Sequence, residues 1–333
     1  MKKFNLLPLI LLTLFFGCEV SEESPDSEQT AESLFQLYDE PAGTNCANGG
    51  LLLETGLDDN QNGLLDANEV TKSEFICNEE NTVEQIDYYF QQGFKDYEDA
   101  IGLSISSEEQ DTSISDLICS INTFSEDTSR VLLKFGQLSQ IISEDFESSS
   151  IYLNEAILYL HTNCIGNNSN YLEVGTFDVV DPYVPTFDQN ATWNQANNSD
   201  LWTSPGSFTD INQNELTFGG FDDRFYFEGG GAYLGSWIPL RLSREAVSRW
   251  ITNEANNKGL VLSLGMDPMG DICFDAVTSN SNERGPMLYL NVEKAPSGER
   301  DAPKTEEQLK SEWDLKTTTE KLAPLYRLLH SKD

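Results

Sequence analysis

Basic residues are scarce in this sequence: 20 Lys and Arg stand against 56 Asp and Glu, which gives a formal net charge of −36. Proteins that bind nucleic acid need clustered Lys and Arg to neutralise phosphates, so nucleic acid is not expected as a partner. Direct adsorption to an anionic membrane is disfavoured for the same reason. The charge instead attracts cations to the surface of the protein.

Histidine is also scarce, with only His161 and His330 in the chain. The sequence contains no HExxH, GxSxG or phosphate-loop motif. Because carboxylates are so abundant, no pair of them identifies a general acid and base. The sequence therefore predicts a protein that is not an enzyme.

The only long apolar run is short for a membrane span. It covers residues 6–16, follows Lys2 and Lys3, and ends before Gly17-Cys18. A hydrocarbon core of ~30 Å needs a longer helix, so residues 1–17 are predicted to be a cleaved signal peptide. Residues 18–37 are mostly acidic and polar, which predicts a solvated tether.

The Gly17-Cys18 pair resembles the lipobox of bacterial lipoproteins, in which the cysteine becomes the lipidated N-terminus. The resemblance implies that Cys18 carries the lipid and that the membrane is contacted only through this anchor. It also implies a place in the bacterial cell envelope, as an outer membrane lipoprotein exposed at the surface. The acidic residues after Cys18 loosely fit a signal for export to the outer face.

The segment 58–69 has the spacing of a calcium-binding loop. Calcium takes six to eight hard oxygen ligands, and a loop with oxygen side chains at positions 1, 3, 5, 9 and 12 wraps around the ion. Gly63 at position 6 permits the sharp turn. The ligands predicted for a structural Ca²⁺ are Asp58, Asn60, Asn62, the Leu64 carbonyl, Asp66 and Glu69. A polar turn without an ion is the alternative.

Five cysteines remain once Cys18 is assigned to the lipid. Cys46 and Cys77 bracket the loop segment, so we expect them to form a disulfide. At most one further pair can form among Cys119, Cys164 and Cys273, and the sequence leaves the choice open. The flanks of the loop carry no amphipathic helical pattern, so a true EF-hand is not expected. The residues 40–79 resemble a short domain of unknown function found in secreted bacterial lipoproteins, and a module over residues 38–79 is predicted.

Residues 83–294 consist of short apolar segments separated by Gly, Asn, Asp and Ser, and the segment lengths suit strands. One helix is expected after Ser243, with Ala246, Val247, Trp250 and Ile251 on one face. The predicted fold is mainly β: a jelly-roll-like β-sandwich with one short helix, preceded by the small module stabilised by a disulfide and calcium. The strands are expected at Val131–Phe135, Ala156–Leu160, Leu172–Val180, Arg224–Glu228, Leu260–Leu264 and Met287–Val292.

A series of motifs follows one another in this region: Phe90–Gly93 with Tyr97, Asp111–Ile114, Arg130–Phe135, Ala156–Leu160, Ala191–Asn194, Leu201–Gly206, Trp237 with Val247–Trp250, Gly259–Leu262 and Pro286–Val292. Their order resembles the DNRLRE domain, which belongs to carbohydrate-binding module family 96. The resemblance implies an extracellular β-sandwich that binds polysaccharide or a surface glycan.

Aromatic side chains are the natural contacts for flat sugar faces. Trp193, Trp237 and Trp250 belong to framework segments and are expected in the core. Trp202 and Phe208 lie in a Gly/Pro/Ser-rich loop and are candidates for an exposed glycan platform, with Tyr183 as a further candidate.

The tail, residues 297–333, has a different composition. A helix could begin near Pro303, with Leu309 and Trp313 on one face and Pro324 limiting its length. Packing on the sandwich, binding a partner and remaining loose are all open. Two hypotheses follow from the sequence: a lipid-anchored glycan-binding protein, or a structural or adhesive scaffold that docks a surface protein partner and binds no sugar.

Overall fold

The computed structural model describes residues 33–78, 85–107, 116–122, 127–146, 151–165, 171–177, 185–202, 205–207, 222–227, 235–265, 269–277, 284–294 and 304–331. All of them belong to one compact unit, Ala31–Asp333. The predicted leader and Cys18 lie outside the described residues. No described helix is long and apolar enough to span a membrane.

The first three strands form a small antiparallel sheet: β1 (Ser33–Glu40), β2 (Gly50–Leu57) and β3 (Val70–Cys77). β1 begins inside the segment expected to be a tether, so the prediction that residues 33–37 are solvated linker is wrong. Leu37 pairs with Leu53 of β2, and both belong to the apolar side of the small sheet, so this segment is anchored as a strand.

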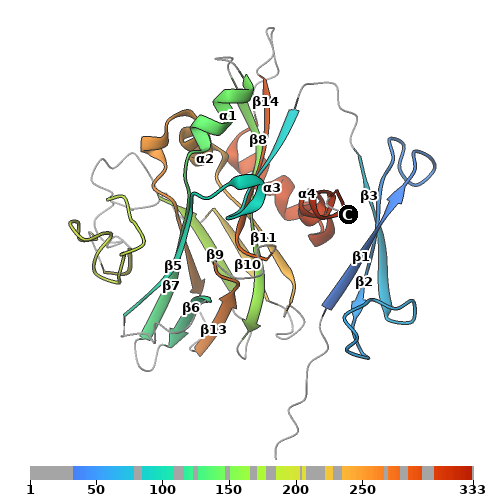
Figure 1. Cartoon of the computed structure of the whole chain (residues 1–333), viewed down its shortest axis with the longest axis horizontal. Helices are drawn as coiled ribbons and strands as arrows, with labels where there is room; N and C mark the ends of the chain where they lie inside the picture. Colours follow the sequence, from blue (N-terminus) through green and yellow to red (C-terminus); the bar gives the residue numbers. More distant parts are fainter. Residues whose placement is uncertain are drawn as a thin grey trace, which may run out of the picture. The chain divides into compact units, whose positions relative to one another are not determined.

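The larger part is a β-sandwich (Figure 1). Its described strands are β4 (Gln85–Phe90), β5 (Ala100–Ser106), β6 (Leu117–Asn122), β7 (Asp127–Phe135), β8 (Ile151–Ile165), β9 (Tyr171–Thr176), β10 (Asp223–Tyr226), β11 (Trp237–Arg241), β12 (Leu260–Gly265), β13 (Met269–Phe274) and β14 (Met287–Lys294). They are connected in the order β10-β9-β12-β7-β6-β13-β8-β14-β4, with β11 on β8 and β5 on β7. The expected strands are confirmed, although β9 ends at Thr176 and β10 at Tyr226. Residues 178–180 and Glu228 of the two expected ranges lie outside the described residues.

The long strand β8 joins the two layers. Its earlier residues pair with β14 and β11, and its last residues, from Thr162 to Ile165, pair with β13. The core between the layers contains Leu158 and Leu160 of β8 together with Leu133 of β7 and Leu262 of β12. One strand therefore contributes to both sheets that enclose the main core.

Both faces of the layer formed by β4, β14, β8 and β11 are buried. Along β8, Leu158 faces the main core, whereas Ile157 and Tyr159 belong to a second apolar cluster on the opposite face. Met287 and Tyr289 of β14 join that second cluster. Because successive strand residues point to opposite faces, a strand buried on both sides needs a continuous apolar run.

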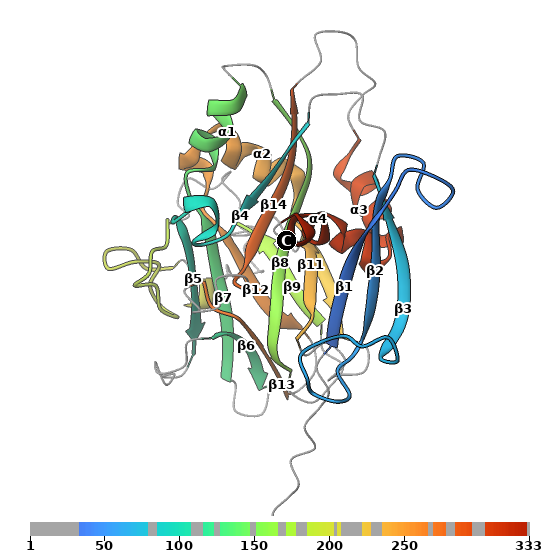
Figure 2. The same cartoon turned by 45° about the vertical axis from the view of Figure 1, so that its right-hand side comes forward.

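The described part of the sandwich has two α-helices where one was expected, and the tail has two more. The predicted one is α2 (Arg244–Thr252), whose N-cap Ser243 accepts a hydrogen bond from the Ala246 N–H. Helix α1 (Leu138–Phe146) packs beside it at the same end of the sandwich (Figures 1 and 2). Its sequence was not recognised as helical, because only Leu138, Ile142 and Phe146 mark the apolar face.

The tail forms two helices, α3 (Glu306–Leu315) and α4 (Thr318–His330), each with a capping box. Pro324 was expected to limit the helix, yet it lies inside α4. Proline removes the helical hydrogen bond to the carbonyl of Glu320, and the burial of Pro324 and its neighbours in α4 offsets that loss. The Pro324 carbonyl also accepts a hydrogen bond from Tyr89 Oη at 3.0 Å.

Helix α4 lies between the small sheet and the sandwich (Figures 1 and 2). The second apolar cluster brings together Leu53 of β2, Leu325 of α4 and Tyr159 of β8. Polar contacts extend the junction on the side of the small sheet, where Arg327 donates to the Cys77 carbonyl and His330 lies 2.9 Å from Asp39. Helix α4 of the tail thus holds the small module and the sandwich together by packing against both.

Two disulfides join described cysteines. The predicted Cys46–Cys77 bond closes the small module and is confirmed. The second bond joins Cys164 of β8 to Cys273 of β13, which are opposite each other in the antiparallel pairing. Cys119 lies in β6, opposite Ile272.

Candidate functional site

The predicted calcium loop is the connection between β2 and β3. Strands flank the segment 58–69 on both sides, which confirms that this is not an EF-hand with two helices. Asp58 and Glu69, at the two ends of the loop, are only 4% and 3% exposed. Buried carboxylates need partners, because an ionised group without them is strongly destabilising.

Asp58 organises the first half of the loop. Its Oδ1 accepts a hydrogen bond from the Asn62 N–H at 3.0 Å, and its Oδ2 accepts one from the Gly63 N–H at 2.8 Å. Both Gln61 (φ 57°) and Gly63 (φ 75°) adopt the left-handed conformation that turns the chain back on itself. The carboxylate thus holds the tight turn that the glycine permits.

Glu69 organises the second half. Its two oxygens accept hydrogen bonds from the backbone N–H groups of Asn60 (3.2 Å) and Asp66 (3.0 Å). The side chain therefore reaches back across the loop, which is the position that a bidentate calcium ligand at loop position 12 requires.

The remaining oxygen side chains meet at Asp66. The Nδ2 groups of Asn60 and Asn62 donate to Asp66 Oδ2 at 2.8 and 3.0 Å, while their Oδ1 atoms accept backbone hydrogen bonds. Rotating the two carboxamides would direct their Oδ1 atoms toward the same place as Asp66. The donor set of carboxylates, amides and the predicted Leu64 carbonyl fits the hard-oxygen preference of calcium.

Within the described ranges, no three His, Cys, Asp or Glu side chains are grouped as a metal site. An ion in the loop would therefore depend on the amide oxygens of Asn60 and Asn62 as well as on the carboxylates.

The predicted glycan platform is not where the sequence placed it. Trp202 is 6% exposed, its ring stacks on Phe177 at 6.0 Å, and its Nε1–H donates to the Thr192 carbonyl. The expectation that Trp202 is exposed is wrong, because the loop folds back onto the outer face of the sheet around Val261. Phe208 and Tyr183 lie outside the described residues.

The other tryptophans largely agree with the framework assignment. Trp237 and Trp250 are buried, as expected. Trp193 is half-buried, and the Arg130 guanidinium lies 4.9 Å from its ring.

Exposed aromatic rings occur instead on the outer face of the small sheet. Tyr38 of β1 and Phe75 of β3 both pair with Leu52 of β2, so the three side chains form one row across the sheet. Tyr38 is 43% and Phe75 46% exposed, and Leu52 is half-buried. We call these three residues the aromatic row. Sequence reasoning missed it, although alternation within the three segments would have placed them on one face once strands were assumed.

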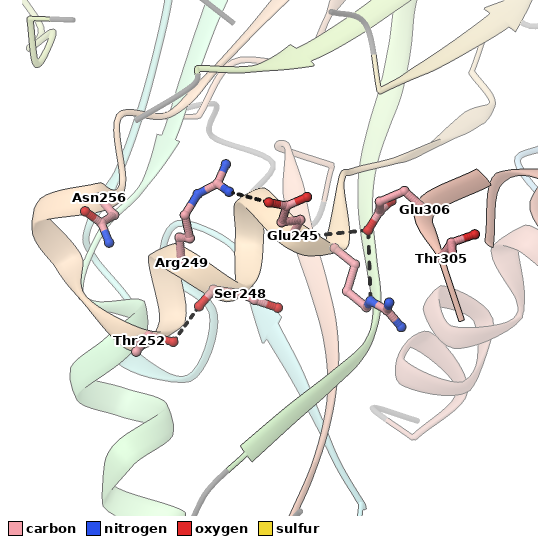
Figure 3. A pocket seen from close by; sticks show the side chains of 8 residues that line it. Glu245, Ser248, Arg249, Thr252, Asn256, Thr305 and Glu306 are labelled. Atoms are coloured by element: carbon pink, nitrogen blue, oxygen red, sulfur yellow. Dashed lines mark hydrogen bonds and ion pairs between the residues drawn. The ribbon is translucent and has the colours of Figure 1, made fainter. Parts of the chain in front are cut away.

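A polar groove of about 600 Å³ runs along α2 (Figure 3). Within it, Arg249 bonds to Glu245 at 3.1 Å, and Arg244 lies 3.9 Å from Glu306. Each arginine thus faces a carboxylate, so the groove presents paired charges and hydroxyl groups. None of its lining residues is aromatic: Arg244, Glu245, Ser248, Arg249, Thr252, Asn256, Thr305 and Glu306.

His161 is buried in β8 and both of its ring nitrogens are engaged. Nδ1 lies 2.7 Å from Asp275 Oδ2, and Nε2 lies 3.0 Å from the Gly235 carbonyl. Burial lowers the pKa of His161, with Asp275 acting in the opposite direction. These contacts give the imidazole a structural role in the sandwich.

The fold and the loop define a β-sandwich protein with an accessory Asx-rich module. Residues 32–77 match the family described as "Domain of unknown function (DUF7151)". The match covers β1 to β3 and the loop between β2 and β3, and it ends before the sandwich. No curated protein matches the chain.

Proposed function

We propose that this protein is a non-catalytic, lipid-anchored glycan-binding protein of the bacterial cell envelope, with a structural calcium ion in the loop 58–69. The sandwich supports the glycan part, because the motifs that resemble the DNRLRE domain of carbohydrate-binding module family 96 supply its framework strands β7, β8, β12 and β14. The anchor rests on the lipobox-like Gly17-Cys18.

The observation that carries the calcium part is that backbone N–H groups of the loop converge on the buried carboxylates of Asp58 and Glu69. The side chains of Asn60 and Asn62 meet at Asp66 in the same loop. The loop connects β2 to β3, so an ion there would hold the small sheet in register. The flanking strands support a structural role, since a sensor loop is flanked by two helices that calcium opens, and this loop is flanked by β2 and β3.

Calcium titration of the purified, leader-free protein tests this part. At a calcium concentration 100 times its dissociation constant, binding adds ~2.7 kcal/mol to the free energy of unfolding. We expect Glu69→Gln to lose that gain. Asp59→Asn is the matched control, because Asp59 is an exposed acid of the same loop outside the ligand set. Equal responses of both variants to calcium would refute the site.

Binding to an array of polysaccharides, with calcium and again with chelator, tests the glycan part. We expect specific binding to uncharged glycans, since a net charge of −36 repels anionic ones. No binding to any glycan would contradict the proposal.

The burial of Trp202 favours a second candidate function, a scaffold that binds a surface protein and no sugar. A blank glycan array together with reproducible capture of one surface protein from the envelope would support this alternative. The control repeats the capture with the full, lipid-anchored chain and with the leader-free protein, and asks whether capture requires the anchored chain.

A further inference from the structure

The outer face of the small sheet combines exposed rings with hydrogen-bonding groups. The row of paired residues beside the aromatic row is Gln36, Glu54 and Ser73. Gln36 and Ser73 are exposed, and Glu54 is half-buried with its Oε1 3.5 Å from Ser73 Oγ. Apolar rings next to carboxylate, amide and hydroxyl groups match the two kinds of surface that a sugar presents: a flat apolar face and a rim of hydroxyls.

We propose that this face, rather than the sandwich, is the glycan-binding site, and that it takes an uncharged, extended polysaccharide. This inference rests on the proposed function. Tyr38 and Phe75 stack on two sugar rings of one chain, Leu52 contacts the chain between them, and Glu54 accepts hydrogen bonds from hydroxyl groups.

The register of the sheet sets the spacing of the two rings. Tyr38 and Phe75 lie on strands on either side of β2, both opposite Leu52. Neighbouring strands are ~4.8 Å apart, so the two side chains leave the sheet ~10 Å from each other. That separation corresponds to two sugar rings with one further ring between them in an extended chain lying across the strands, and the middle ring lies over Leu52.

The size and charge of the face favour a glycan over a protein. An aromatic side chain offers 150–250 Å² when fully buried, so two half-exposed rings offer only ~200 Å² in total. A stable protein interface needs ~800 Å² on each partner. Glu54 and Glu40 are acceptors on this side of the sheet, which suits hydroxyl donors and disfavours an anionic ligand.

Calcium would act on this site through the strands. The loop 58–69 joins β2 to β3, which carry Leu52 and Phe75. An ion that fixes the loop thereby fixes the alignment of Phe75 with Leu52. Weaker glycan binding in chelator follows from this connection.

The test is a binding assay of the leader-free protein with insoluble cellulose and chitin and soluble laminarin as uncharged probes, and alginate as an anionic control. We expect the double variant Tyr38→Ala/Phe75→Ala to lose at least roughly tenfold in affinity for the probe that the unaltered chain binds. Tyr226→Ala is the matched control, because Tyr226 is an aromatic residue of the sandwich that is 59% exposed. The ring-preserving Tyr38→Phe/Phe75→Tyr variant should keep the affinity.

The outcomes separate this inference from the proposed function. Undiminished binding by the Tyr38→Ala/Phe75→Ala variant overturns the placement on the small sheet and leaves glycan binding intact. A loss of affinity in Tyr226→Ala alone would place the site on the sandwich, and it would also overturn the placement on the small sheet. No binding of any probe by the unaltered chain overturns both proposals. An unchanged melting temperature of each variant establishes that a loss of affinity comes from the missing rings.

Discussion

Removing the disulfide between Cys164 and Cys273 should destabilise the protein more than removing the one between Cys46 and Cys77. The first bond closes a sequence separation of 109 residues and the second a separation of 31. In the chain-entropy model, a cross-link limits the unfolded chain more strongly when the loop it closes is longer. The model gives about 4.8 kcal/mol for the longer loop and about 3.7 kcal/mol for the shorter one.

Urea unfolding of double alanine variants measures the two contributions. Alanine is the suitable replacement, because Cys46 is buried and a serine hydroxyl there would lack a partner. Cys119→Ala is included in every variant and in the reference protein, so that no free thiol exchanges with the remaining bond.

The expected result is a loss of free energy of unfolding that is about 1 kcal/mol larger for Cys164→Ala/Cys273→Ala than for Cys46→Ala/Cys77→Ala. The m-value should rise in both variants, since an unfolded chain without the cross-link exposes more surface. A larger loss for the Cys46–Cys77 variant would refute the reasoning from loop length. It would mean that local strain or the loop 58–69 dominates the stability of the small module.

Three further predictions concern the tail and its contacts. Trp313→Phe removes the 2.7 Å hydrogen bond from Nε1 to Asp223 together with part of the buried ring, so it should lower the free energy of unfolding by at least ~1.5–3 kcal/mol; an unchanged urea midpoint would contradict this. Leu325→Ala, at a fully buried position between small sheet and sandwich, should cost ~2–5 kcal/mol in the same assay, and a cost below ~1 kcal/mol would show that α4 is not held there. Burial raises the pKa of the Asp222 carboxyl to about 6, so the folded state binds the carboxyl proton more tightly than the unfolded chain does. The free energy of unfolding therefore falls by up to ~3 kcal/mol as the pH rises from ~4 to ~6. Asp222→Asn should remove that part of the pH dependence, which thermal unfolding at several pH values would reveal; an identical pH profile in the variant would contradict the assignment.

Local patterns in the sequence determined several features correctly. The spacing of Asp58, Gly63 and Glu69 predicted a tight loop, and these residues make the hydrogen bonds that hold it. Ser243 predicted the start of a helix, because an N-cap hydroxyl acts on the backbone only three residues away. Strands such as Val131–Phe135 were recognisable from their apolar runs. The ion itself and the lipid on Cys18 stay predictions.

Contacts between distant segments were decided only by the tertiary structure. Cys164 could pair with Cys273 rather than with Cys119 because β8 and β13 place the first two opposite each other. Trp202 looked like an exposed loop residue, since nothing in its neighbourhood shows that the loop folds onto Phe177. Pro324 was expected to limit a helix, but the apolar residues that bury this part of α4, such as Leu53 and Tyr159, lie far away in the sequence.

The role of the tail illustrates the same difference. The sequence predicted one helix in the tail, with Leu309 and Trp313 on one face, because amphipathic spacing acts within a few residues. The structure has two helices, each with a capping box. The surface that this apolar face covers was decided by the apolar side chains of β2 and β8, which form one cluster with α4. Neither strand is near α4 in the sequence. Burying all three surfaces together removes more apolar area from water than any pair alone, and only the folded chain brings them into one place.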